Sequence, residues 1–334
     1  MEFARITGTE LSVSRIALGT WAIGGWMWGG ADDEQAVRTI RSALDRGVTL
    51  IDTAPVYGFG HAEEVVGRAI KESRERDRVV LATKVGLNWS DGQPFRDSRP
   101  ERITAEVEAS LRRLGTDHID IYQVHWPDPE TPIEATAEAM QKLFEQGKIR
   151  AIGVSNFSRD QMHDFRKVAR IHTAQPPFNL FERDAEDIVL PYCHWHSIAV
   201  LAYGPICRGL LSGRMRSDTL FSGDDLRQVD PKFRQPRFGQ YLRAVEDLDN
   251  FARQNYGTRV IHLALRWVLD QPGVTTALWG ARRPSQVDPL GEVMGWRLDA
   301  DAMREIDRIL RRNIRDPVGP QFMAPPSRPE AVAA

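Results

Sequence analysis

The stretch VTLIDTAPVYG, residues 48–58, runs from an almost entirely apolar segment into a loop that begins near Pro55. A short apolar run that ends at a proline is typical of a strand that is buried on both faces. The run ends on an acid, Asp52, and a phenol, Tyr57, follows five residues later. We therefore predict a strand over 48–52 that delivers Asp52 and Tyr57 to the same edge of a sheet.

Seven further segments have the same strand-like character: RIALGT (15–20), VVLATK (79–84), IDIYQVH (119–125), IRAIGVS (149–155), HTAQ (172–175), SIAVLAY (197–203) and VTTALW (274–279). Helical patterns lie between them, among others at 33–47, 102–115 and 132–147, where apolar residues recur at helical spacing. Eight strand-then-helix units predict parallel strands. Closing such a set gives an α/β fold, the (β/α)8 TIM barrel, with catalytic residues at the carboxyl ends of the strands.

The remaining segments predict how the barrel is plugged and covered. The opening FARITGTELSVSR (3–15) predicts an N-terminal β-hairpin at the barrel bottom. Residues 212–240 form too long a connection for an ordinary loop and predict a lid. The end, 316–334, has five prolines in 19 residues, which excludes a regular helix. We expect one domain over 1–334, with extended loops at the C-terminal rim and a Pro-rich C-terminal tail.

Composition narrows the class of protein. The 334 residues, 42% hydrophobic and 27% charged, fit a soluble globular protein with a large core. A net charge of −2 argues against nucleic acid or a membrane surface as a partner. The chain has two cysteines, no signal-peptide pattern and no apolar run near the roughly 18 residues that cross a bilayer. We expect a cytoplasmic protein that is a monomer by default, with an oligomer left open.

Four polar residues fall at strand ends or just beyond them. Asp52 ends the second strand, Tyr57 follows it, Lys84 ends the third strand and His125 ends the fourth. A barrel brings all of these ends to one rim. A phenol has an ordinary pKa of about 10, and a nearby ammonium is expected to lower it. Asp52 would hold Lys84 charged, His125 would orient a substrate oxygen, and Tyr57 would exchange a proton with it.

Motifs along nearly the whole chain resemble the aldo-keto reductase superfamily: LGTW (18–21), IDTAPVYG (51–58), ATK (82–84), QVHWP (123–127) and IGVSNF (152–157). Three later pieces resemble its bacterial general-stress and inositol-related branch: LAYGPICRGLLSG (201–213), ALWGARRPSQ (277–286) and DPVGPQFMAPP (316–326). The resemblance implies a (β/α)8 barrel that binds a nicotinamide cofactor, NADPH rather than NADH, without a metal.

The resemblance also implies roles for single positions. Asp52, Tyr57, Lys84 and His125 match the catalytic tetrad. The amide and hydroxyl groups of Ser155, Asn156 and Gln175 match residues that hydrogen-bond the nicotinamide carboxamide. Tyr203 matches the aromatic residue that stacks on the nicotinamide ring. The other implied cofactor positions are Gly19, Thr20, Trp21, Asp52, Gly204, Pro205, Gly209, Leu210, Ser212, Gly280, Arg282, Arg283 and Gln286, of which Gly209, Leu210 and Ser212 lie where the pyrophosphate is met.

A physical argument that is independent of the resemblance also favours phosphate binding by Arg282 and Arg283. They precede Pro284, which can start a helix, and a helix N-terminus together with arginines favours phosphate, including a 2′-phosphate. Family members often carry Glu-Asn a few residues after the glutamine, whereas this chain reads Pro289-Leu290. That departure puts the usual adenine contacts in doubt, and with them the strength of the NADPH preference.

Each of these residues also has an ordinary alternative. Asp52 or Ser155-Asn156 could cap the next segment, and Arg282 and Arg283 could be a solvated pair.

Two other motifs suggest binding sites that we reject. GFGHAE (58–63) resembles a dinucleotide fingerprint, but an acid replaces its third glycine. CHWH (193–196) precedes the seventh strand, which places it at the barrel bottom, and no second cluster at zinc spacing accompanies it.

Tryptophans are concentrated on the loops of the expected active rim. Trp21, Trp26 and Trp28 follow the first strand, with Trp89 and Trp126 on neighbouring loops. They could wall a substrate pocket that suits sugars or small aldehydes, or they could simply pack loop against helix.

Two functions follow. The first is an enzyme that reduces an aldehyde or ketone with NADPH, or oxidises an alcohol in reverse, with Tyr57 as the proton-transfer group. The second is a cofactor-sensing regulatory or binding module with little turnover, as some relatives of the superfamily are. That alternative predicts tight cofactor binding without turnover of small aldehydes.

Overall fold

Eight parallel strands close into a barrel in the computed structural model of the chain, which describes residues 1–329. The strands are β3 (Ile16–Gly19), β4 (Leu50–Asp52), β5 (Val80–Val85), β8 (Ile121–Val124), β9 (Ile152–Ser155), β10 (Thr173–Gln175), β11 (Ala199–Tyr203) and β12 (Val274–Gly280). Around the barrel their order is β3-β4-β5-β8-β9-β10-β11-β12, closed by the β12–β3 pair. All eight predicted strands and the (β/α)8 fold are confirmed.

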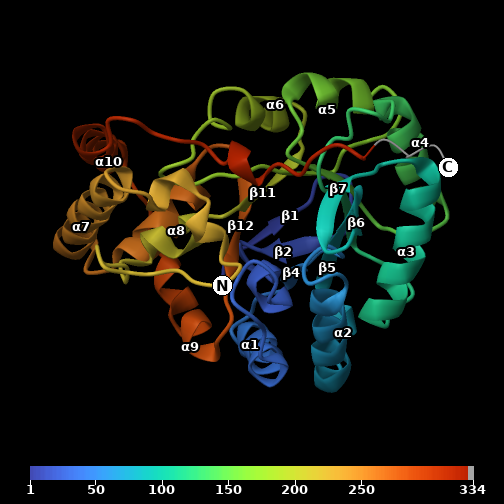
Figure 1. The fold of residues 1–334 in the computed structure, drawn as a ribbon, viewed down its shortest axis with the longest axis horizontal. Helices are drawn as coiled ribbons and strands as arrows, with labels where there is room; N and C mark the ends of the chain where they lie inside the picture. Colours follow the sequence, from blue (N-terminus) through green and yellow to red (C-terminus); the bar gives the residue numbers. More distant parts are fainter. Residues whose placement is uncertain (330–334) are drawn as a thin grey trace.

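Helices cover the outside of this barrel (Figure 1). They are α1 (Asp33–Asp45), α2 (His61–Ser73), α3 (Pro100–Leu114), α4 (Ile133–Glu145), α5 (Arg159–Phe165), α6 (Val189–Trp195), α7 (Arg237–Tyr256), α8 (Val260–Asp270), α9 (Pro284–Val287) and α10 (Ala300–Asn313). Local sequence sets several ends: the Asp32 carboxylate accepts from the Gln35 amide at the start of α1, and left-handed Gly115 (φ 65°) ends α3. The three helical patterns expected from the sequence are α1, α3 and α4.

The N-terminal hairpin plugs the bottom of the barrel, as predicted. β1 (Phe3–Arg5) pairs antiparallel with β2 (Ser12–Ser14). Ile6, Leu11 and Val13 pack in one cluster with apolar side chains of the barrel strands, among them Leu50 and Ile121. This apolar floor leaves the opposite rim as the open end.

Three segments cover the rim. The predicted lid, 212–240, is irregular with two short 3-10 turns, η4 (Leu226–Gln228) and η5 (Pro231–Phe233). Its predicted end is wrong, because α7 already begins at Arg237. A second hairpin, β6 (Leu87–Ser90) with β7 (Gln93–Arg96), was not predicted. Its Asp91-Gly92 turn, with φ of 50° and 72°, is a sequence signal that could have revealed it.

The C-terminal tail crosses the rim to this second hairpin (Figure 1). It leaves α10 as irregular chain with a single 3-10 turn, η7 (Gln321–Met323). The backbone N–H and Nε of Arg96 donate to the carbonyls of Pro326 and Pro325 at 3.0 and 2.9 Å. The predicted irregular tail is confirmed up to residue 329, and its last five positions, 330–334, lie outside the described residues.

Two classes of feature are absent from residues 1–329. No helix there is long and apolar enough to span a membrane. No three His, Cys, Asp or Glu side chains in that range are grouped so that they could hold a metal. The CHWH sequence lies at the end of α6, where Cys193 is buried in the core.

Candidate active site

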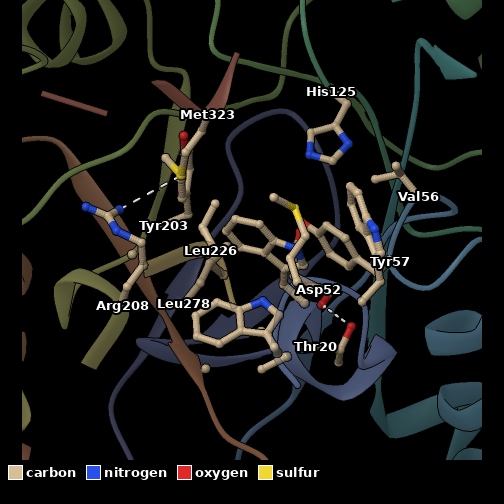
Figure 2. A pocket seen from close by; sticks show the side chains of 18 of the residues that line it. Thr20, Asp52, Val56, Tyr57, His125, Tyr203, Arg208, Leu226, Leu278 and Met323 are labelled. Carbon is tan, nitrogen blue, oxygen red and sulfur yellow. Dashed lines mark hydrogen bonds between the residues drawn. The ribbon is translucent and has the colours of Figure 1, made fainter. Parts of the chain in front are cut away.

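A cavity of about 600 Å³ opens at the carboxyl ends of the barrel strands. Strand ends form its floor, and the tryptophan-rich loop, the lid and the tail form its walls (Figure 2). Most predicted site residues line it: Gly19, Thr20, Trp21, Asp52, Tyr57, His125, Ser155, Asn156, Gln175, Tyr203, Gly204, Pro205, Gly209, Gly280, Arg282, Arg283 and Gln286. Residues that are far apart in the chain therefore meet at one site.

Asp52, Lys84 and Tyr57 form a connected group at the floor. Lys84 Nζ lies 2.5 Å from Asp52 Oδ1, 3.0 Å from the carbonyl of Thr53 and 3.2 Å from Tyr57 Oη. Lys84 is fully buried, and Asp52 and Tyr57 are 2% and 9% exposed. The pairing of β4 with β5 sets this geometry, because it places Asp52 opposite Ala82 and Lys84 two residues further along the strand.

The pKa of Tyr57 is raised, and the predicted lowering by Lys84 is wrong. Burial raises the pKa of the Tyr57 phenol well above its ordinary value, and the nearby charge of Asp52 raises it further. Burial lowers the pKa of Lys84, against the opposing effect of Asp52. Proximity to an ammonium was therefore the weaker influence, because removal of the phenol from water disfavours its charged form more. Tyr57 is a protonated phenol at neutral pH.

His125 completes the group of four. Its ring lies edge-on to the Tyr57 ring, with centroids 5.7 Å apart, and it faces the cavity. Burial lowers the pKa of His125 well below its ordinary value, and the charge of Lys84 adds to this effect. A neutral imidazole can donate one hydrogen bond to a carbonyl oxygen without competing with Tyr57 as an acid.

A fifth polar residue, Gln123 on β8, was missed from the sequence. Its amide Nε2 donates to Asp52 Oδ2 at 3.1 Å, and the side chain is fully buried beneath the cavity floor. Gln175 Nε2 donates to the same oxygen at 2.8 Å. The signal was available, because Gln123 stands in QVHWP with its side chain on the same face of the strand as that of His125 two residues later.

Ser155, Asn156 and Tyr203 form a hydrogen-bonded row beside Gln175. Ser155 Oγ donates to the Gln175 carbonyl at 2.7 Å, and Asn156 Nδ2 donates to Ser155 Oγ and to the His125 carbonyl. Tyr203 Oη donates to Asn156 Oδ1 at 3.0 Å. Asn156 has a left-handed backbone with φ 60°, which an asparagine tolerates better than most residues. These hydrogen bonds hold the side chains of Ser155, Asn156 and Tyr203 in place where they line the cavity.

The loop after β11 reaches the cavity only in part. Gly204, Pro205 and Gly209 line it, with left-handed φ of 68° and 88° at the two glycines. Leu210 is fully buried, and the hydroxyl of Ser212 donates to the Gly209 carbonyl at 2.5 Å. Neither Leu210 nor Ser212 is part of the cavity wall, so a contact of theirs with a ligand stays a prediction.

Positive charge gathers at one end of the cavity. Arg283 is exposed there and has no carboxylate partner within residues 1–329. Arg282 donates to the carbonyls of Trp28 and Gly30 at 2.6 and 2.8 Å, so it also fastens the tryptophan-rich loop. Arg227 of the lid lines the same cavity and was not predicted. Burial lowers the pKa of Arg282, and repulsion by Arg283 and Arg227 adds to this effect while Asp225 opposes it.

The predicted tryptophan wall is largely present. Trp21, Trp26, Trp28 and Trp126 line the cavity, and the Trp21 ring stacks on Tyr57 at 6.0 Å. Trp89 does not line it and instead packs against Phe59. The tail adds a wall that sequence patterns did not reveal, at Phe322, Met323, Ala324, Pro325 and Pro326.

Known proteins resemble this chain over most of its length. The profile of the Aldo/keto reductase family matches residues 15–311. The Aldo-keto reductase YhdN of Bacillus subtilis (strain 168) is 59% identical over 330 residues, which cover 99% of this chain and 100% of that protein. The NADH-specific methylglyoxal reductase of Escherichia coli (strain K12) is 36% identical over 322 residues, 91% of this chain and 98% of that protein.

A solved structure gives the same result. The glycerol dehydrogenase AKR11B4 from Gluconobacter oxydans superposes with a TM-score of 0.88 at 54% identity, covering 96% of this chain and 99% of that chain. The likeness therefore includes the whole barrel and the loops that carry the cavity.

Proposed function

The chain belongs to the aldo/keto reductase family and is an NAD(P)H-dependent oxidoreductase of carbonyl compounds, and from this we propose that Tyr57 is its general acid, supported by Lys84, Asp52 and His125. The observation that carries the proposal is the 3.2 Å contact between Lys84 Nζ and Tyr57 Oη at the floor of the cavity. It joins a neutral phenol that faces the cavity to a buried ammonium that can stabilise the phenolate.

The residues of the cavity fit a nicotinamide cofactor. Gly19, Gly204, Gly209 and Gly280 leave backbone without side chains along its wall, and Tyr203 offers a ring face. Ser155, Asn156 and Gln175 would meet the carboxamide, and Arg282, Arg283 and Gln286 the adenosine end. When bound there, a reduced nicotinamide would supply the hydride for the substrate carbonyl carbon.

The side chains at the floor of the cavity would carry out the proton transfer. Tyr57 gives its phenolic proton to the substrate oxygen, and the resulting phenolate is left 3.2 Å from the Lys84 ammonium. Asp52, at 2.5 Å from that ammonium, keeps it charged and in place. His125 donates an N–H to the same substrate oxygen. The apolar walls of Trp21, Trp28 and Leu226 exclude water from the transfer.

We propose NADPH over NADH as the preferred cofactor. Arg283 is exposed at the charged end of the cavity and is free to pair with a 2′-phosphate. Pro289 and Leu290 replace the usual Glu-Asn, and the relative in Escherichia coli is NADH-specific, so the preference should be modest. Arg283→Ala should weaken NADPH binding about tenfold and leave NADH binding unchanged. An equal change for both cofactors would contradict a 2′-phosphate contact.

Small polar carbonyls are the proposed substrates. The relatives that reduce methylglyoxal or oxidise glycerol act on three-carbon compounds, and the reactive end of this cavity is walled by tryptophans and by the tail. We therefore propose small aldehydes, including sugars in open form, in the direction of reduction, and small polyols in reverse.

The decisive experiment is a panel of small aldehydes with NADPH and with NADH, followed by absorbance of the reduced nicotinamide. Tyr57→Phe should lower kcat by about 10² to 10⁴ and leave cofactor affinity near that of the wild type. If Tyr57→Phe keeps its turnover, the acid assignment is wrong. Tight cofactor binding without turnover of any aldehyde would instead favour the cofactor-sensing module.

Three further features of the chain are proposed as well. We propose one domain over 1–334, a monomer in the cytoplasm, and membership of the general-stress and inositol-related branch on the pieces 201–213, 277–286 and 316–326. Light scattering of the purified chain and fractionation of cells test the assembly and the location.

A further inference from the structure

Two buried amides share one oxygen of the catalytic carboxylate. Gln123 Nε2 and Gln175 Nε2 lie 3.1 and 2.8 Å from Asp52 Oδ2, while the other oxygen of Asp52 accepts from Lys84. Gln175 Nε2 lies in addition 3.2 Å from Gln123 Oε1. The three side chains therefore form a closed triangle of hydrogen bonds beneath the cavity.

The chemistry of this triangle fixes the direction of each amide. An ionised carboxylate only accepts hydrogen bonds, so both amides must turn their NH2 groups toward Asp52. The NH2 of Gln175 has two hydrogens, and Asp52 and Gln123 accept both of them. Among the described residues, none donates to Gln175 Oε1. Gln175 thus has only an acceptor to offer to the cavity that it lines.

The barrel is shaped to let Gln123 reach this position. Gln123 on β8 lies opposite Gly153 on β9, and Gly153 lies opposite Thr173 on β10. A Cβ added to Gly153 would come within 2.6 Å of Gln123 Cγ. The missing side chain on β9 therefore makes room for Gln123 to reach across to Gln175 on β10.

We propose that Gln123 is a positioning residue that locks the Gln175 amide with its oxygen toward the cavity, so that the site accepts a hydrogen bond from an N–H donor of the ligand. The inference rests on the proposed role of Gln175 at the nicotinamide carboxamide, and it deepens that role. Gln123 itself does not line the cavity, so it acts only through Gln175 and Asp52.

A cofactor analogue tests the lock. Reduced 3-acetylpyridine adenine dinucleotide phosphate replaces the carboxamide NH2 with a methyl group, so it has no N–H for Gln175 Oε1. Wild-type protein should therefore use NADPH with a kcat/KM at least about tenfold higher than that for the analogue, which leaves the acceptor unpaired. In Gln123→Met the Gln175 NH2 keeps Asp52 but loses its second acceptor, so one hydrogen bond alone aims Oε1 at the cavity and this ratio should fall severalfold.

A second variant checks the role without depending on Gln123→Met. In Gln123→Glu a protonated carboxyl keeps both functions of the amide: its O–H donates to Asp52 and its C=O accepts from Gln175. Asp52 opposes ionisation of the new carboxyl, and Lys84 on the other side of Asp52 favours it. A carboxyl at position 123 accepts from Gln175 in either protonation state, so Gln123→Glu should retain the wild-type ratio of NADPH to analogue, a rescue by the conservative variant that a merely structural role would not produce.

Tyr122→Phe is the matched control. Tyr122 is the neighbour of Gln123 on β8, is fully buried on the opposite face, and its hydroxyl has no hydrogen-bond partner among the described residues. This variant should keep the wild-type ratio. If Gln123→Met also keeps it, or if Gln123→Glu loses it as Gln123→Met does, the positioning role is wrong. If wild-type protein reduces no aldehyde with NADPH, the proposed function fails instead.

Discussion

Two groups of buried charges in this molecule have the same net charge, and we propose different roles for them. At the floor of the cavity, Asp52 and Lys84 form one ion pair. A second group lies at the rim and is called the rim cluster. It consists of Glu182, Arg208, Asp230 and Lys232, whose side chains are at most 4% exposed. Both groups are electrically neutral, and both are removed from water, so burial of charge does not by itself identify the catalytic one.

The difference lies in what each cation contacts besides a carboxylate. Arg208 is held by Glu182 and Asp230, and Lys232 Nζ lies 2.8 Å from Glu182 and 3.2 Å from the Gly319 carbonyl. Lys84 pairs with a single carboxylate, Asp52, and also donates a hydrogen bond to Tyr57. Tyr57 is a neutral group that can ionise, and it faces the cavity. Of the two lysines, the one that reaches an ionisable neutral group at the cavity is the one that we propose for catalysis, and the one whose hydrogen bonds and ion pairs go to carboxylates and a carbonyl is the one that we assign to structure.

The rim cluster joins three segments that cover the site. Glu182 follows β10, Arg208 follows β11, and Asp230 and Lys232 belong to the lid. The tail adds Phe322, whose ring lies 5.4 Å from the Arg208 guanidinium and 6.0 Å from Lys232 Nζ. We infer that the cluster fixes the lid and the tail as cavity walls.

The largest expected effect separates the two lysines. Lys84→Met should lower kcat by about 10² or more, because the Tyr57 phenolate loses its cation. Lys232→Met should leave kcat within about threefold and lower the free energy of unfolding by about 3 kcal/mol or more, because it leaves buried carboxylates short of a cation. Aldehyde reduction and urea unfolding of both variants measure this contrast. An equal loss of kcat in both would abolish the distinction between catalytic and structural charge.

The sequence allowed one of the two groups to be predicted. Asp52, Tyr57, Lys84 and His125 each end a strand or follow one, and a barrel must bring such positions together. The rim cluster has no comparable rule, because its members lie in irregular segments whose meeting depends on tertiary packing. Gln123 was missed because it is a single polar residue in an apolar strand, and nothing in the sequence pattern links it to Asp52. The pKa direction of Tyr57 was missed because desolvation depends on how deeply the fold buries the phenol, which the sequence does not show.

Acid should weaken the rim cluster at one identifiable residue. Burial would raise the pKa of Glu182, but Arg208 and Lys232 outweigh it and hold that pKa below its ordinary value. The folded state therefore gains stability from ionised Glu182 above the unfolded pKa of about 4.3, and loses it as the pH falls through the folded pKa. Glu182→Gln should be several kcal/mol less stable than wild type at pH 7, with the gap closing toward acid pH. Urea unfolding over a pH series measures this, and a constant gap would contradict the assignment.

The floor group should show its own pH signature in the rates. Because burial raises the pKa of Tyr57 and lowers the pKa of His125, the acid form of Tyr57 and the neutral form of His125 both persist across neutral pH. Aldehyde reduction should be flat there and fall at alkaline pH as Lys84, whose pKa burial lowers, loses its proton. Alcohol oxidation needs the phenolate and should rise about tenfold per pH unit below the pKa of Tyr57. Lys232→Met should keep both profiles, and a shift in that variant would link the rim cluster to the proton step.

The smallest effect tests whether the tail is fastened by charge or only by contact. Phe322→Leu keeps an apolar side chain but removes the ring that faces Arg208 and Lys232, so the free energy of unfolding should fall by about 1 kcal/mol. Phe251→Leu is the control, because Phe251 is also half-buried but packs on Tyr256 and faces no cation within residues 1–329. Because Phe322 also lines the cavity, its loss should raise KM for the aldehyde severalfold while kcat stays unchanged. Equal losses of stability in the two variants would mean that the rim cluster holds the lid alone and that the tail depends on its backbone bonds to Arg96.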